Sequence, residues 1–274
     1  MDRIPVLDHG YLEVIDVWGS DQRIVEAARM STNKGFLGWG LKCRNCGDAF
    51  ADPERDCPSP QRGQNPYADS GRGGHVFDAP GDEKLLRFLW EHDHATPFEM
   101  AGLTFEVQAP IFVFREWHRH RIPFGYNEMS SRYVPLPDVN YVPSVERLMM
   151  GSDGKNKQAS TVKGAVALTE DMAQSFRANL VESYEYAQKL YERALAVGVP
   201  KELARVHLPV GRYSRMRATG NLRGWLAFLK LRMAPNAQWE IREYAFAVAR
   251  AIAESFLHTW EIASEGLPPL PSLG

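Results

Sequence analysis

The sequence predicts an α+β fold that is dominated by helices and contains one small sheet. Two short segments, 11–17 and 103–107, alternate apolar and polar residues as half-buried strands do. A longer segment, 169–198, has the periodicity of an amphipathic helix. Hydrophobic residues make up 44% and charged residues 24% of the 274-residue chain, which is ordinary for a globular protein. We expect a single domain over residues 1–274.

The first strand leads into two helices. After the segment 11–17, Asp21 is expected to cap a short helix, because an Asp side chain accepts hydrogen bonds from the free N–H groups of a first turn. The second helix begins at Asp82, has apolar residues at helical spacing, and ends near Thr96 and Pro97.

Two prolines mark the third helix. Pro110 follows the strand 103–107 and suits the first turn of a helix. Pro123 disfavours helical geometry in the residue before it. The sequence therefore predicts a helix from about 111 to 121.

The C-terminal part is helical. Gly198 and Pro200 are expected to end the long helix 169–198, since glycine is common just after a helix and proline cannot continue one. Further helices are predicted at about 201–208, 221–233 and 236–262.

An irregular stretch, rich in Gly, Pro and Asp, separates the first two helices, and we expect an insert at about 36–80. All three cysteines lie in it, at Cys43, Cys46 and Cys57. Cys-x-x-Cys followed by glycine resembles a zinc knuckle, so one zinc ion is expected, with His75 or water as the fourth ligand. The alternative is three free thiols in a loop.

Charge and hydropathy exclude some classes of protein. A formal net charge of −2 and a pI of about 6.5 argue against a general nucleic-acid binder. The N-terminus has no apolar core of signal-peptide length, and no apolar run is long enough to span a bilayer. We expect a cytoplasmic protein that binds neither nucleic acid nor membrane.

The segment REWHRHRIPFGYNEMSSRY, residues 115–133, is dense in charged and aromatic side chains. One interpretation is a solvated helix followed by a salt-bridged loop. The other is an anion-binding site, because guanidinium groups bind phosphate and carboxylate in bidentate fashion. Arg232 favours the second: it shares an inward stripe with Trp225 and Leu229, and a buried arginine needs either a ligand anion or an internal glutamate as its partner.

These residues carry a resemblance to a known family. The string Arg119-His120-Arg121, followed by NEMSSRY at 127–133, resembles the signature of the flavin-dependent thymidylate synthases. Four further segments are similar to the family in the same order: EAARMST, HDHATPFEMAGLTFEVQAPIFVFREWHRHR, KELARVHLP and NLRGWLAFLKLRMAPNAQWEIREYA. The resemblance covers most of the chain outside 36–80 and 148–168.

The resemblance implies a homotetramer whose subunits have a small mixed sheet and long helices, with flavin and nucleotide between subunits. It implies reductive methylation of carbon 5 of dUMP to give dTMP. Methylene-tetrahydrofolate would give the carbon, reduced FAD the hydride, and NADPH would reduce the flavin.

The resemblance also implies roles for the residues at matched positions. FAD would be bound by Ser31, Thr96, Arg119, His120, Arg121, Glu128, Asn221 and Arg223. The nucleotide would be bound by Glu116, Arg119, Glu128, Ser130, Ser131, Arg132, Arg205 and Arg232. Catalytic roles would fall to Arg232, Ser130 and His94.

Some positions depart from the family pattern. Glu116 stands where glutamine is frequent, and Ala227 and Asn236 stand where a flavin-contacting asparagine and histidine are common. No cysteine remains outside the insert to act as nucleophile. Arg232 is therefore expected to stabilise a uracil ring ionised at nitrogen 3, with a covalent role of Ser130 as the competing idea. His94 has an alternative role in ending a helix.

Three other functions compete with this one. A paralogue of the same fold would methylate UMP or a related uracil nucleotide in a specialised pathway. A zinc-knuckle module would use CRNCG and the arginines to hold nucleic acid. An inactive scaffold would keep the fold without the reaction. A yellow protein favours the enzymes over the nucleic-acid module, and turnover of dUMP against UMP separates the enzymes from each other.

Overall fold

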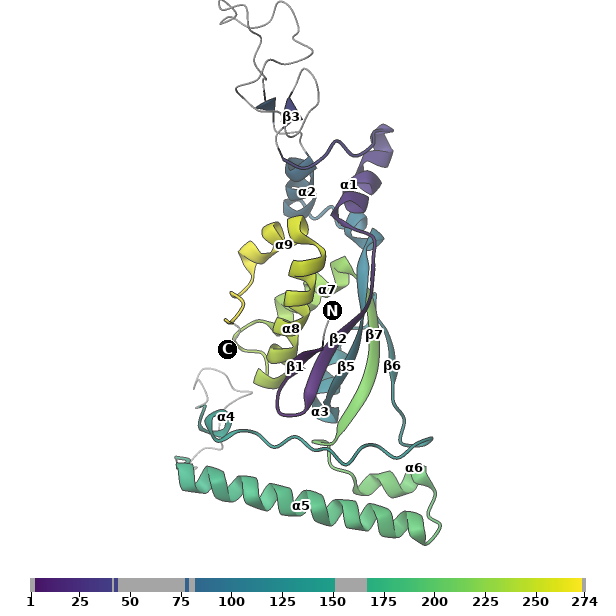
Figure 1. The fold of residues 1–274 in the computed structure, drawn as a ribbon, viewed down its shortest axis with the longest axis vertical. Helices are drawn as coiled ribbons and strands as arrows, with labels where there is room; N and C mark the ends of the chain where they lie inside the picture. Colours follow the sequence, from purple (N-terminus) through teal and green to yellow (C-terminus); the bar gives the residue numbers. More distant parts are fainter. Residues whose placement is uncertain (1–2, 41, 44–76, 79–81, 151–166, 273–274) are drawn as a thin grey trace, which may run out of the picture.

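The computed structural model describes residues 3–40, 42–43, 77–78, 82–150 and 167–272. Five strands form the main sheet in the order β1-β2-β5-β7-β6 (Figure 1). Their bounds are Ile4–Val6, Gly10–Trp18, Gly102–Pro110, Tyr213–Asn221 and Gly125–Glu128, respectively. Every neighbouring pair in this sheet is antiparallel, so the expectation of a mixed sheet is wrong. Alternating apolar and polar residues tell which face of a strand is buried, and a sheet with one solvated face is typically antiparallel.

The strand β7 was not predicted, although it pairs with β5 along its whole length, from Tyr213↔Pro110 to Asn221↔Gly102. Its side chains alternate as a half-buried strand requires, with Met216 and Ala218 buried and the arginines and threonine between them exposed. β7 therefore has one polar, exposed face and one apolar face that packs against the helical layer.

Three helices cover the other face of the sheet (Figure 1). They are α3, Ile111–Trp117; α7, Leu222–Arg232; and α8, Trp239–Ser255. Between them and the sheet lies an aromatic core in which Trp117 and Trp225 are fully buried and their rings meet edge to face at 5.9 Å. This core fixes α3 against α7, which matters because residues of both helices belong to the predicted site.

α3 is shorter than the predicted helix 111–121. Pro110 is its N-cap and the last residue of β5, and His118 is its C-cap. His120 donates its backbone N–H to the carbonyl of Trp117 at 2.9 Å, in a turn that leaves the helix. Arg115 and Arg119 therefore do not share a helical face.

α1, Asp21–Arg29, is capped by Ser20 and not by Asp21, since the Ser20 hydroxyl accepts from the N–H of Arg23 at 3.2 Å. The buried Asp21 carboxylate instead accepts the backbone N–H groups of His258 and Thr259 at 2.9 and 3.2 Å. These residues begin α9, Leu257–Ala263, so Asp21 caps a helix that is distant in sequence. The predicted helix 236–262 is divided accordingly, with the break at Phe256.

The long helix α5, Glu170–Ala196, lies across one end of the sheet and packs against α4 and the segment after Pro200 (Figure 1). It confirms the predicted helix, and Gly198 follows its end in a left-handed conformation with φ of 85°. The bounds of its neighbours are Val145–Met149 for α4, Lys201–Ala204 for α6 and Arg205–His207 for the 3₁₀ helix η4. Within the described ranges, no helix is both long and apolar enough to cross a membrane.

α1 and α2, Asp82–Glu91, lie at the opposite end of the molecule from α5 (Figure 1). The 3₁₀ helices η1, Met30–Thr32, and η3, Thr96–Met100, follow them, and η5, Ser264–Gly266, follows α9. The buried Asp82 carboxylate accepts the backbone N–H groups of Leu37 and Gly38, both at 2.6 Å, and pairs with Arg29. Beyond this anchor, β3, Lys42–Cys43, pairs with β4, Phe77–Asp78.

Candidate active site

The predicted site residues lie in three groups along the molecule. One group surrounds a small pocket where β6 ends, one lies at the contact of α3 with α7, and one lies around η3 and the start of α7.

The small pocket has a volume of about 330 Å³. It is lined by the predicted nucleotide-binding residues Glu128, Ser130, Ser131 and Arg205, together with Ile111, Met129, Leu136 and Leu208. Met129 continues the sheet by donating its N–H to the carbonyl of Arg215 at 2.8 Å, which places residues 130 and 131 just beyond the edge strand. A guanidinium, two hydroxyls and a carboxylate thus converge from segments far apart in sequence.

Hydrogen bonds hold the polar wall of this pocket. Ser131 is buried, and its hydroxyl accepts a long hydrogen bond of 3.4 Å from Nη1 of Arg205. The Ser130 hydroxyl accepts from the backbone N–H of Arg132 at 3.3 Å, and the Ser130 carbonyl accepts from Tyr133 at 3.0 Å, closing a turn. This turn faces the serines inward. Arg132 points away and pairs with Glu202 at 3.2 Å on the surface, so the structure separates it from the other residues predicted to bind nucleotide.

The second group centres on Arg232, the last residue of α7, whose side chain is 16% exposed. Its Nε donates to Nε2 of His120 at 2.9 Å, Nη1 pairs with the Glu116 carboxylate, and Nη2 donates to the Glu116 carbonyl at 3.0 Å. The internal glutamate considered as an alternative partner is therefore present. A guanidinium has five N–H donors and three are used, which leaves about two for a ligand.

His120 is half-buried between aromatic rings, with its ring 4.8 Å from that of Phe228. Burial, and secondly the charge of Arg232, lower the pKa of His120 to about 4. The imidazole is neutral at pH 7, so Nε2 has a free lone pair for the Arg232 N–H. On the same loop, Arg119 and Arg121 are exposed, and among the described residues neither guanidinium has a hydrogen bond or an ion pair.

The third group lies around η3. The backbone N–H of His94 bonds to the carbonyl of Leu89 at 2.8 Å, that of Asp93 bonds to Trp90 at 3.3 Å, and Asp93 is left-handed with φ of 55°. These bonds form a Schellman motif. The alternative role of His94 in ending a helix is therefore correct for its backbone. Its side chain remains exposed, as do those of Ser31 and Thr96.

Asn221 and Arg223 join this group from α7. Asn221 is the N-cap of α7, and its side-chain oxygen accepts from the N–H of Gly224 at 2.9 Å. Arg223 pairs with Glu99 of η3 at 2.5 Å. No sequence signal marked Glu99 as its partner, because the two residues are 124 positions apart.

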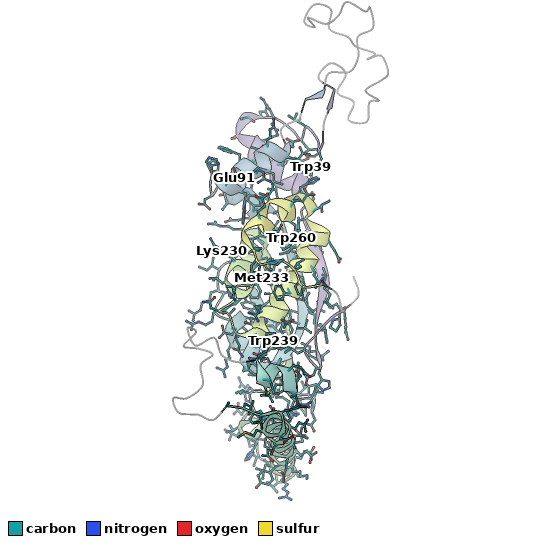
Figure 2. The ribbon with its side chains drawn as sticks, turned by 90° about the vertical axis from the view of Figure 1, so that its left-hand side faces the viewer. Trp39, Glu91, Lys230, Met233, Trp239 and Trp260 are labelled. Atoms are coloured by element: carbon teal, nitrogen blue, oxygen red, sulfur yellow. The ribbon has the colours of Figure 1, made fainter. Side chains whose placement is uncertain are left out.

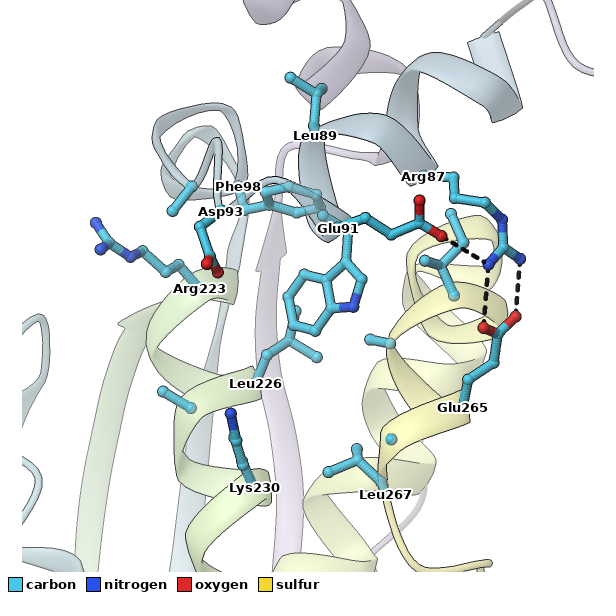
Figure 3. A pocket seen from close by; sticks show the side chains of 16 residues that line it. Arg87, Leu89, Glu91, Asp93, Phe98, Arg223, Leu226, Lys230, Glu265 and Leu267 are labelled. Carbon is cyan, nitrogen blue, oxygen red and sulfur yellow. Dashed lines mark hydrogen bonds and ion pairs between the residues drawn. The ribbon is translucent and has the colours of Figure 1, made fainter.

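A large pocket of about 750 Å³ adjoins Arg223, between α2, α7 and the C-terminal segment (Figure 3). Leu89, Phe98, Leu226 and Leu267 supply apolar walls, and Arg87 closes the rim through Glu265 at 2.8 Å and Glu91 at 3.5 Å. Glu91 and Lys230, which both line it, lie along the same edge of the molecule in Figure 2. Apart from Arg223, which also lines it, the residues of this pocket were not predicted, since apolar and surface charged residues carry no distinguishing pattern.

The predicted zinc site cannot be placed in this geometry. Cys43 is the second residue of β3, whereas Cys46, Cys57 and His75 lie outside the described residues. Among the described residues, no three potential metal ligands cluster. The zinc ion stays a prediction.

Comparison with known proteins assigns the family. The model of the thymidylate synthase complementing protein family matches residues 13–256. A flavin-dependent thymidylate synthase of Thermotoga neapolitana is 33% identical over 94% of this chain and 93% of its own length. The chain belongs to the flavin-dependent thymidylate synthase family. A second such synthase, of Thermus thermophilus, is 34% identical over 96% of this chain and 79% of its own.

Solved structures agree with this membership. The UMP/dUMP methylase PolB of Streptomyces cacaoi, bound with 5-Br UMP, superposes with a TM-score of 0.71 at 28% identity, over 98% of this chain and 99% of PolB. The same methylase bound with 5-Br dUMP gives 0.69 at 29% identity, over 96% of this chain and 98% of that one. This flavin-dependent thymidylate synthase homologue is therefore an enzyme of the methyltransferase type.

The residues present fit a flavin that carries phosphate groups. Arg119 and Arg121 offer exposed guanidiniums that no described carboxylate neutralises, and the exposed hydroxyl of Thr96 lies in the group that contains Asn221 and Arg223. The hydroxyl of Ser31, in η1, is exposed as well. Such a set of donors suits the pyrophosphate and sugar of FAD. Arg223 is less available, because it is paired with Glu99.

Proposed function

We propose that this enzyme converts dUMP to dTMP by reductive methylation of carbon 5, with methylene-tetrahydrofolate as the carbon donor and NADPH as the reductant. The small pocket carries the proposal, because it joins Ser130 and Ser131 to Arg205, more than seventy residues away, in one wall whose guanidinium and hydroxyl groups can donate to an anion. The family membership and the PolB likeness support a uracil nucleotide as the ligand of this wall.

The chain's own groups have distinct tasks in this proposal. Arg205 and the two serine hydroxyls would bind the nucleotide phosphate, and Glu128 would accept a hydrogen bond from the sugar. The unused N–H groups of Arg232 would donate to the uracil edge and stabilise the negative charge that makes carbon 5 nucleophilic. FAD, when bound, supplies hydride. Arg119 and Arg121 would hold its phosphates, and His94 and Thr96 would border it.

We also propose that the enzyme is a homotetramer in which flavin and nucleotide lie between subunits. The separation of the three groups in one chain supports this. Arg223 at the start of α7 and Thr96 in the adjacent η3 lie at one end of β7, whereas the small pocket, with Glu128, lies toward its other end. A site shared between copies would bring groups from different ends of the chain together.

UMP is the second candidate substrate. The observation in its favour is the match, over nearly the whole chain, to a protein described as a UMP/dUMP methylase. The two substrates differ by one ribose hydroxyl.

The test is turnover by protein reconstituted with FAD. Each nucleotide is supplied separately with methylene-tetrahydrofolate and NADPH, and the methylated product is separated by chromatography. We expect dTMP, and faster NADPH oxidation in the presence of dUMP. Preferential methylation of UMP would select the second candidate. Flavin binding without methylation of either nucleotide would contradict both.

A further inference from the structure

The orientation of the Arg232 guanidinium is determined by residues of the segment 116–120. His120 accepts from Nε, and Glu116 accepts from both terminal nitrogens, through its carboxylate and through its own carbonyl. Three acceptors at three different nitrogens fix the plane of the group, which a single ion pair would leave free to rotate.

The position of Glu116 explains how one residue offers two acceptors. It is the penultimate residue of α3, which ends at Trp117, and the last four carbonyls of a helix have no partner within it. Arg232 bonds to one of these free carbonyls from a neighbouring helix. The carboxylate of the same residue extends alongside and binds the adjacent Nη1.

His120 completes the arrangement and is itself immobilised. Its ring lies 4.8 Å from Phe228 and 6.2 Å from Phe124, both at steep interplanar angles. The neutral imidazole accepts from Nε and cannot swing away without losing these contacts. The two unused N–H groups of Arg232, one on each terminal nitrogen, are therefore held in fixed positions.

We propose that Glu116 is a positioning residue that aims Arg232 at the pyrimidine, and that it does not itself contact the nucleotide. The inference rests on the proposed role of Arg232 in the methylation. The family resemblance makes Glu116 a nucleotide-binding residue, whereas the inference assigns its oxygens to Arg232. The side chain at position 116 needs only an acceptor atom that reaches Nη1 of Arg232. A negative charge on that side chain is not required.

The experiment measures kcat and KM for dUMP with FAD-reconstituted protein, together with the dissociation constant for dUMP by calorimetry. Glu116→Ala removes the carboxylate but keeps the carbonyl and His120. We expect kcat to fall about 10- to 100-fold, since misplacing a group by about 1 Å has this effect. KM and the dissociation constant should stay within about threefold, because the interaction is lost only in the transition state.

Glu116→Gln keeps an oxygen at the same reach, and its kcat should stay within about threefold of wild type. Glu13→Ala is the matched control: Glu13 also pairs with an arginine, at 2.7 Å, and its side chain is 29% exposed against 34% for Glu116. Glu13→Ala should leave all constants unchanged. If Glu116→Ala does not fold, Glu116→Asp replaces it, because its carboxylate is one methylene too short to reach Nη1.

Three results would overturn the inference alone, provided that wild type methylates a uracil nucleotide. The first is that all constants of Glu116→Ala, or of its Asp replacement, are unchanged. The second is that this variant has a raised KM and dissociation constant with unchanged kcat. The third is that kcat falls as far in Glu116→Gln as in Glu116→Ala. The second result would make Glu116 a substrate contact, and the third would make its charge essential. A wild type that methylates neither nucleotide would instead remove the proposed function, and the inference with it.

Discussion

At the scale of single residues, Arg232 has Glu116 as a partner in the structure and the uracil ring as a partner in the proposed reaction. Replacing it by alanine removes the charge-assisted contact to uracil, which should cost about 2–4 kcal/mol in the transition state, or about 30- to 1000-fold in rate. It also leaves the Glu116 carboxylate and carbonyl without their donor. Unfolding measurements should therefore show a loss of about 1–2 kcal/mol, limited by the partial exposure of Glu116.

Ser130→Ala is the paired variant for this prediction. If the serine only positions the nucleotide, the variant keeps measurable turnover, while Arg232→Ala loses nearly all of it. An inactive Ser130→Ala beside an active Arg232→Ala would reverse the two roles and favour a covalent serine.

His120 should make stability depend on pH. Its pKa in the folded protein is lowered to about 4, chiefly by burial and further by Arg232, against an ordinary value of about 6.5. Between these values the unfolded chain binds the proton and the folded chain does not. Stability is therefore lost as the pH falls through this window, by about 1–2 kcal/mol between about pH 7 and 5.

The measurement is urea denaturation of wild type and His120→Gln at both pH values. Glutamine still offers an oxygen to Nε of Arg232 but does not titrate. The difference between pH 7 and 5 should be smaller in the variant. Identical differences would mean that His120 takes up its proton as readily in the folded protein as in the unfolded chain.

Residues of the site differ in how far the sequence predicts them. The resemblance assigns Glu128, Ser130, Ser131 and Arg205 to nucleotide binding, and these four residues line one pocket; their binding role stays a prediction. Periodicity alone put Arg232 on the inward stripe with Trp225, and the structure agrees. Neither identified which glutamate pairs with it, because Glu116 is 116 positions away and pairing across helices leaves no local pattern.

At the scale of elements, the start of α7 combines two roles in one residue. Asn221 caps the helix through its side-chain oxygen, and the resemblance makes it a flavin contact. Asn221→Ala should lower the free energy of unfolding by about 1 kcal/mol, whereas Asn221→Asp keeps the capping oxygen and should cost little.

FAD titration of these two variants separates the roles. If the amide group binds flavin, both substitutions weaken binding. If Asn221 acts only by holding the first turn, flavin affinity should follow helix stability and fall in the alanine variant alone.

Elements with a strong local pattern were predicted well, and those determined by distant contacts were not. α5 matches the expected helix closely, since its stripe and its glycine end signal lie within the segment itself. β7 was missed because arginines occupy its solvent face. The break between α8 and α9 was missed as well, because the Asp21 carboxylate that caps α9 comes from the other end of the chain.

At the scale of the whole molecule, α5 has an apolar stripe that one chain covers only in part. Tyr191 at one end of the stripe is buried, whereas Met172 and Phe176 at the other end are 46% and 48% exposed. Apolar residues exposed together in this way are typical of a protein interface. The uncovered half of α5 therefore supports contact with another copy.

Light scattering under native conditions should give about four times the chain mass of 31.0 kDa. Phe176→Glu places a charge in the uncovered stripe and should reduce the mass. Ala178→Glu adds the same charge to an exposed position on another face of α5 and should not. A wild-type mass of 31.0 kDa would exclude the tetramer.

The anchor at Asp82 has a consequence for protein engineering. The backbone N–H groups of Leu37 and Gly38 bond to Asp82, and β3 pairs with β4 through Lys42 and Asp78, so Cys43 and Phe77 lie side by side in the described structure. Loop-closure entropy changes only slowly with length, so connections of different length between two paired positions differ little in free energy. The adjacent positions Cys43 and Phe77 are thus a natural grafting point, where a tag, a reporter domain or a short linker can be joined without altering the strand order of the main sheet.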